Sequence, residues 1–153
     1  MNVHAHRYKQ RLDYLFKQIS ALPSDPELQS HWARYLCVLV SGFIETSVIA
    51  IYTKYAEDKS TKQIASYVAR QLDRFQNPTM ERILSLTYSF STDWGHELKK
   101  ATEGELKAAI DSIVANRNNI AHGQDVTITY ARIHEYYKSA VKVIEMIDKQ
   151  CST

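Results

Sequence analysis

The sequence predicts an all-α fold, a single bundle of five to six helices, on three observations. The chain has 153 residues, of which 44% are hydrophobic, and this suffices for one domain with a buried core. Only four glycines and three prolines occur, which disfavours a turn-rich β architecture. Apolar residues recur at helical spacing over most of the chain. We therefore expect one helical domain over residues 1–153.

Three helices are expected in the first half of the chain. The first spans residues 6–22 and ends at a turn that contains two prolines. The second spans residues 31–57 and is apolar nearly all round, so it is expected to be buried. The third is capped by Ser60 or Thr61 and extends to residue 75. The expected core residues of the first and third helices are Leu12, Leu15, Phe16, Ile19, Ile64, Val68 and Leu72.

The second half of the chain is expected to hold the remaining helices. Asn77-Pro78 breaks the chain and can start a helix that contains Ile83 and Leu84. Residues 89–103 are polar and are expected to be irregular. A helix over residues 102–122 follows, because Thr102 and Glu105 have the spacing of a capping box.

The last expected helix follows a short extended link. Gly123 can adopt the left-handed conformation that ends the preceding helix, and residues 124–128 form the link. Thr129 can then cap a helix that extends to residue 149. Its apolar side consists of Ile133, Tyr136, Tyr137, Val141, Ile144 and Ile147.

Several classes of function are not supported by the sequence. The apolar segment Leu36–Ile51 is shorter than a membrane span and contains Glu45, so a buried core helix is expected and a membrane partner is not. The N-terminus lacks a signal peptide, and the two cysteines show neither disulfide nor metal-ligand spacing. A cytoplasmic location is therefore expected. No phosphate-binding loop, nucleophile elbow or convergent histidine set occurs, so neither a cofactor nor a metal is expected.

The positive charge of the chain is concentrated near its N-terminus. The net charge is only +2, too small to indicate a nucleic-acid partner by itself. The first 20 residues nevertheless hold Arg7, Lys9, Arg11 and Lys17 against Asp13 alone. This segment is either a phosphate-binding patch or an ordinary solvated helix face.

Two charged residues occupy positions where the pattern calls for apolar ones. Arg117 continues the apolar stripe of the helix over residues 102–122, at the four-and-three spacing that keeps one helix face. Glu45 is the only charge between Leu36 and Ile51. A pair between Arg117 and Glu45 would offset the cost of burying either charge, so a structural ion pair is the alternative to a functional arginine. The full stripe reads Leu106, Ile110, Ile113, Arg117 and Ile120.

His122 follows Arg117 at the end of the same helix. The two residues are separated by about 140° of rotation and about 7.5 Å of rise, so a long arginine can lean toward the histidine. Histidine changes its charge near neutral pH, which suits acid–base chemistry. A lone histidine at a helix end is more often only a polar cap. The pairing with Arg117 is what favours a functional role.

The segment from Arg117 to Gly123, Arg-Asn-Asn-Ile-Ala-His-Gly, resembles the motif of the HEPN superfamily. It matches the Arg-Asn-x-x-Ala-His-Gly form of prokaryotic members, including the RiboL-PSP-HEPN type. The long apolar helix with an acidic residue and the tyrosine-rich last helix fit as well. The resemblance covers roughly residues 6–150, most of the chain. The motif alone is short, and it gains specificity because its arginine interrupts a core stripe.

The resemblance implies a metal-independent endoribonuclease that acts as a homodimer. Two motif helices would meet near a two-fold axis and share one cleft. Arg117 and His122 would be the catalytic residues, and Asn118, Asn119 and Glu45 would support them. RNA would be the substrate, and an antitoxin or operon protein would be a further partner. The expected product carries a 2′,3′-cyclic phosphate or its hydrolysed form.

One position departs from a subgroup of the family. In the toxins of HEPN–nucleotidyltransferase pairs, a tyrosine often lies two residues after the histidine, and here Gln124 occupies that position. Membership of that subgroup is therefore not implied. Two other functions stay open: a non-catalytic HEPN module that binds nucleotide, RNA or a partner protein, and a plain helical interaction domain.

Overall fold

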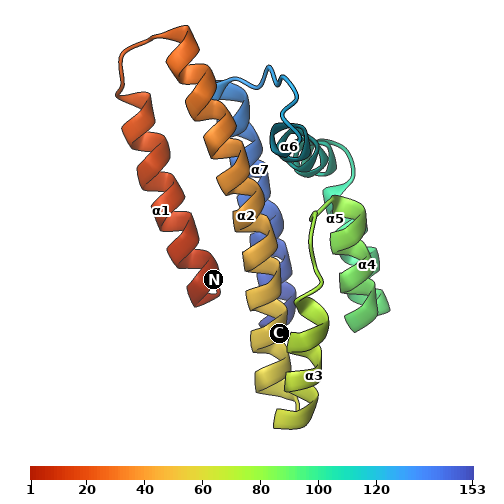
Figure 1. The fold of residues 1–153 in the computed structure, drawn as a ribbon. Coiled ribbons are helices and arrows are strands. Elements are labelled where there is room, and N and C mark those ends of the chain that lie inside the picture. The colour runs from red at the N-terminus through yellow and green to blue at the C-terminus, as the bar shows by residue number, and fades with distance from the viewer.

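The computed structural model describes residues 1–153 and consists of seven α-helices without a strand. This confirms the predicted all-α fold and adds a helix to the expected five to six. In Figure 1 the long helix α2 runs through the centre of the molecule, with α1 on one side, α7 behind it, and α4 to α6 on the other side. The helices are α1 (Val3–Ser20), α2 (Pro26–Lys59), α3 (Lys62–Leu72), α4 (Met80–Phe90), α5 (Thr92–Thr102), α6 (Glu105–Ala121) and α7 (Tyr130–Cys151).

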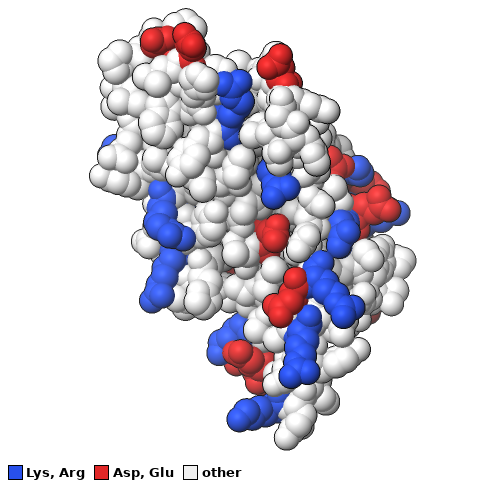
Figure 2. Space-filling model, viewed as in Figure 1, with Lys and Arg blue, Asp and Glu red and all other residues white.

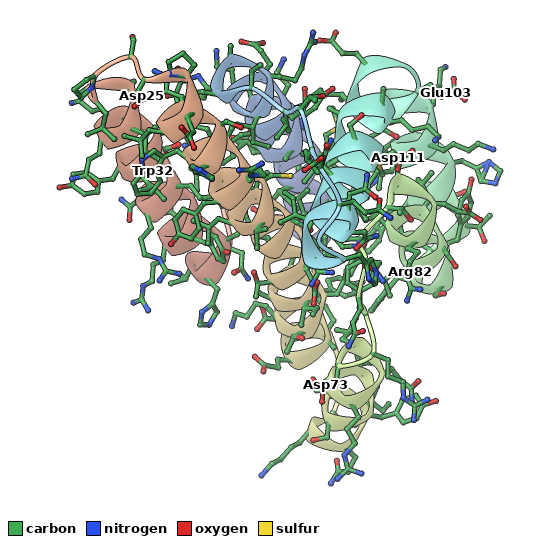
Figure 3. The ribbon with its side chains drawn as sticks, turned by 45° about the horizontal axis from the view of Figure 1, so that its top comes forward. Asp25, Trp32, Asp73, Arg82, Glu103 and Asp111 are labelled. Atoms are coloured by element: carbon green, nitrogen blue, oxygen red, sulfur yellow. The ribbon has the colours of Figure 1, made fainter.

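Helix α2 is the core of the bundle, as its composition predicts. It begins earlier than expected, because Asp25 caps it and Pro26 occupies its first turn, two strong local signals for a helix start (Figure 3). By length and composition alone α2 could cross a membrane. However, 56% of its most apolar window is buried within the protein, where it packs against α1, α3, α6 and α7. The prediction of a buried core helix is therefore confirmed.

Helices α1 and α7 both pack against α2. They also contact each other, and they run in opposite directions. The Tyr130 hydroxyl, at the start of α7, donates to the Phe16 carbonyl at 2.9 Å, near the end of α1. At the opposite end, the Asn2 amide donates to Asp148 at 3.2 Å. The predicted core residues of α1 are buried or half-buried. In α7, Ile133, Tyr137, Ile144 and Ile147 are buried, whereas Tyr136 and Val141 are half-buried.

Helices α3 and α4 differ in detail from the prediction. Thr61 caps α3 as expected, but the helix ends at Leu72 rather than at residue 75. Ile64, expected in the core, is 54% exposed because α3 extends along the end of α2 and only one of its faces is covered. Thr79 caps α4, which therefore begins just after Asn77-Pro78.

The expectation of an irregular segment at residues 89–103 is wrong, because α5 occupies most of it. The Ser91 hydroxyl caps α5 by accepting the Trp94 amide at 3.2 Å. Gly95 is buried against Tyr88 of α4, and any side chain at this position would overlap the Tyr88 ring. Close packing of α4 on α5 therefore stabilises a polar segment that has little helical pattern of its own.

The capping box predicted at the start of α6 is also wrong. Thr102 is the last residue of α5, and its hydroxyl donates to the Leu98 carbonyl at 2.9 Å. Helix α6 instead begins after Gly104, which has a positive φ of 90° and makes no side-chain cap. The chain leaves α5 and enters α6 within a few residues here, and the positive φ at position 104 is one that glycine adopts at little cost.

Candidate active site

Helix α6 carries Arg117, Asn118 and Asn119, and His122 follows as its cap. The middle of α6 is fixed to α2. Ala109, Ile110, Ile113 and Val114 are its only buried residues. The Cys37 thiol of α2 donates to the Ile113 carbonyl at 3.5 Å. Burial raises the pKa of Cys37 to about 12, so this thiol keeps its proton at neutral pH and serves packing rather than nucleophilic chemistry.

Asp111 fixes α6 to α4. Its carboxylate accepts the Met80 amide, at the first turn of α4, at 2.9 Å, and it pairs with Lys107 at 2.6 Å. Figure 3 shows Asp111 on α6 beside α4. Sequence reasoning missed this positioning residue. No signal identifies it, because the contact joins positions far apart in the chain and its donor is a backbone amide.

The motif ends α6 with a regular backbone structure. The Gly123 amide donates to the Ile120 carbonyl at 3.1 Å, and the Gln124 amide donates to the Asn119 carbonyl at 2.9 Å. Together with the φ of 71° at Gly123, these two bonds define a Schellman motif in which His122 is the C-cap residue. The left-handed cap predicted at Gly123 is confirmed, and it fixes the backbone that carries His122.

Arg117 lies where α6 leaves the core. The stripe of Ile110 and Ile113 is fully buried, but Arg117 and Ile120, further along the same stripe, are only half-buried. One Arg117 Nη donates to the Asn118 side-chain oxygen at 3.2 Å. The guanidinium forms no ion pair, since the five ion pairs of the chain involve other residues. Most of its donors are therefore free to bind an anion.

The ion pair considered between Arg117 and Glu45 does not form. Glu45 is half-buried on α2 and belongs to none of the chain's ion pairs. Burial raises the pKa of Tyr8, and the Glu45 charge adds a smaller increase, which places Glu45 near Tyr8 of α1. Because both charges reach solvent, neither carries the desolvation cost that would require a buried partner.

The other motif side chains differ in exposure. His122 and Asn119 are exposed, whereas Asn118 is half-buried beside Arg117. No hydrogen bond joins Arg117 to His122 within the chain. The structure thus brings Arg117 and Asn118 into contact, and it presents His122 to solvent at the end of the same helix.

The motif lies on an open surface of the single chain. A groove of about 920 Å³ lies elsewhere, between the start of α1, the second half of α2 and the end of α7. No three His, Cys, Asp or Glu side chains come together as a set of metal ligands. The arrangement offers an accessible guanidinium and an accessible imidazole, groups that can bind a phosphate and transfer a proton.

Comparison with curated proteins and with solved structures gives no match, whereas comparison with known protein families does. The model of the RiboL-PSP-HEPN family matches residues 6–153, nearly the whole chain. This match confirms the resemblance noted from the Arg117–Gly123 motif. The chain therefore belongs to the RiboL-PSP-HEPN family.

Proposed function

We propose that this protein is a metal-independent endoribonuclease of toxin or phage-defence type. The observation that carries the proposal is the end of α6, where Arg117 has no carboxylate partner and His122 is exposed five residues further along the chain. Membership of a HEPN family supports the same function. A cytoplasmic location and an antitoxin or operon partner belong to this proposal.

The chemistry needs only the substrate and these side chains. The 2′-hydroxyl of RNA is the nucleophile, and its oxygen attacks the adjacent phosphorus while His122 takes the proton. The bond from phosphorus to the 5′-oxygen breaks, and that oxygen receives a proton from a second, protonated imidazole. Arg117 binds the phosphate oxygens and stabilises the charge that develops on them. The products are a 2′,3′-cyclic phosphate and a 5′-hydroxyl.

A second copy of the chain would supply the second imidazole and close the site. The last two turns of α6 have no buried residue, so a partner helix can pack there around a two-fold axis. Such packing would cover Ile120 and would place two copies of Arg117 and His122 on one cleft. It also gives a reason for an arginine on a helix stripe that is otherwise apolar.

The supporting residues have narrower roles in this proposal. Asn118 holds the guanidinium of Arg117 through the bond seen in the structure. Asn119 is exposed and is proposed to contact substrate. Glu45 is proposed to act on Arg117 only after RNA or a partner chain has covered both, because the two form no pair in the free chain.

The decisive experiment measures cleavage of a labelled RNA pool in EDTA by the wild type and by His122→Ala. His96→Ala is the matched control, because His96 is an exposed histidine on α5. We expect His122→Ala to slow cleavage by about 10²–10⁴-fold, the usual contribution of a general acid or base, and His96→Ala to keep full activity. Cleavage that requires added metal, or equal rates in all three proteins, would refute the mechanism.

The same RNA pool separates the proposal from a non-catalytic binding module. A module of that kind binds RNA or nucleotide and leaves every RNA intact. The homodimer is tested by light scattering after size exclusion, where wild type is expected at twice the chain mass. Ile120→Asp is expected to run as a monomer and to lose cleavage, since a charge at that position would be buried in the partner contact.

A further inference from the structure

The outward face of α1 forms a groove that the predicted active site does not use. His4, Arg7, Arg11 and Tyr14 lie along one side of α1 at helical spacing, a stripe about 15 Å long at 1.5 Å per residue. With Tyr8 and with Thr46 of α2 they line a groove of about 740 Å³. The opposite side of α1 is buried against α2 and α7, so this stripe is a free surface.

The groove lining holds two arginines and no acidic residue, and Glu45 of α2 lies outside the lining, near Tyr8. Asp13, the only carboxylate of α1, lies outside the groove, where it pairs with Lys9 at 2.8 Å and accepts the Tyr137 hydroxyl at 2.6 Å. Arg7 and Arg11 belong to none of the chain's ion pairs. Figure 2 shows blue side chains along α1, at the left of the molecule, with no red among them.

Two tyrosines in the groove are held in position by neighbouring side chains or backbone. The Tyr8 hydroxyl donates to the Leu39 carbonyl of α2 at 3.0 Å, and the Arg11 guanidinium lies 5.1 Å from the centre of the Tyr8 ring. The Tyr14 side chain is 63% exposed, and Gln18 donates to its hydroxyl at 3.0 Å. The ring of Tyr14 is therefore held by a hydrogen bond while most of it remains exposed for stacking.

We propose that this α1 groove binds single-stranded RNA, with Arg7 and Arg11 on phosphates and Tyr14 stacked on a base. Arginines between aromatic rings are the combination that single strands need, because phosphates and base faces alternate along them. A lipid surface or an acidic peptide would also pair with the arginines, but neither offers the alternation of phosphates and base faces that matches two arginines beside an exposed tyrosine ring. The occupant that explains both features is RNA.

The groove lies at the same level of α2 as the motif helix. Tyr8 contacts α2 at Leu39, and Ile113 of α6 contacts it at Cys37, within one helical turn. The α1 groove and the middle of α6 therefore lie on α2 at one level, about two interhelical spacings or 16–20 Å apart. This inference rests on the proposed function in one respect: the bound RNA is the strand that Arg117 and His122 cut.

The test measures binding of a fluorescein-labelled, single-stranded RNA of about 16 nucleotides by anisotropy. All proteins carry His122→Ala, so that the RNA stays intact. Arg7→Ala/Arg11→Ala and Tyr14→Ala are compared with Lys99→Ala/Lys100→Ala, which removes the same charge from the exposed end of α5. Circular dichroism melts identify any variant that fails to fold, and Tyr14→Phe keeps the ring if Tyr14→Ala is unstable.

We expect the Arg7→Ala/Arg11→Ala variant to bind RNA about tenfold or more weakly. The slope of log K against log salt concentration should become shallower by about 1.4, because each phosphate contact on a single strand contributes about 0.7 to that slope. Tyr14→Ala should weaken binding about tenfold. Tyr14→Phe and the Lys99→Ala/Lys100→Ala variant should each weaken it less than about twofold. Equal losses of affinity in the double arginine and double lysine variants would refute RNA binding in the α1 groove. Unchanged affinity in the double arginine variant would refute it as well. These binding results are independent of catalysis: a wild type that never cuts RNA refutes the nuclease and leaves the groove tested on its own.

Discussion

Replacement of Gly123 by alanine tests whether the end of α6 positions the catalytic histidine. Gly123 has a φ of 71°, and a side chain there would meet no other atom within 4 Å. The cost is therefore conformational and not steric. Placing an L-residue in the left-handed region costs about 1–2 kcal/mol, and a less flexible unfolded chain offsets part of that. We expect a net loss of about 1 kcal/mol, or about 2–4 °C in Tm for a chain of this size.

Cleavage should fall further than this loss of stability explains. Alanine at position 123 disfavours the φ that allows the amides of residues 123 and 124 to bond back to Ile120 and Asn119. The backbone of His122 then shifts, and a displacement of about 1 Å can cost about 10²-fold in rate. Gly123→Asn should lose less stability and less cleavage activity than Gly123→Ala, since asparagine tolerates this conformation.

The assay combines thermal melts with cleavage of labelled RNA well below the lowest Tm. Gly104→Ala is the matched control, because Gly104 also has positive φ and an open surrounding but lies at the other end of α6. It should lower Tm and keep cleavage. Unchanged Tm in Gly123→Ala, or equal loss of cleavage in the two alanine variants, would refute the reasoning.

Two further predictions concern the contacts that hold α6. Asp111→Ala should lower stability by about 2 kcal/mol in chemical denaturation, because it removes a charged hydrogen bond to the first turn of α4. Lys107→Ala removes only the exposed ion pair and should change stability far less, so equal losses would contradict the role given to Asp111. Burial raises the Cys37 pKa from 9.0 to about 12, so the stability that depends on the neutral thiol is full below pH 9 and is lost as pH rises toward 12. Cys37→Ala should show a shallower decline of Tm over that range, and a decline as steep as that of the wild type would exclude Cys37 as its source.

The sequence by itself determined the features that depend on local chemistry and on periodicity. The apolar residues of α2 predict a buried helix, Thr129 predicts the start of α7, and Gly123 predicts the end of α6; all three are confirmed. Each depends on a few neighbouring residues, whose capping groups or spacing suffice to define the backbone. The Arg117–His122 pair was found in the same way, from an arginine on an apolar stripe, and its catalytic role stays a prediction.

Only the tertiary structure decided the features that depend on contacts between distant segments. Helix α5 exists because Gly95 lets α4 approach closely, and the position of α6 depends on Asp111 accepting a backbone amide of α4. Whether Arg117 and Glu45 form an ion pair also depends on the tertiary structure, and they do not. Spacing showed that both charges lie on apolar faces, but burial depends on how far each helix extends past the core, and that distance is set by the packing of the whole bundle.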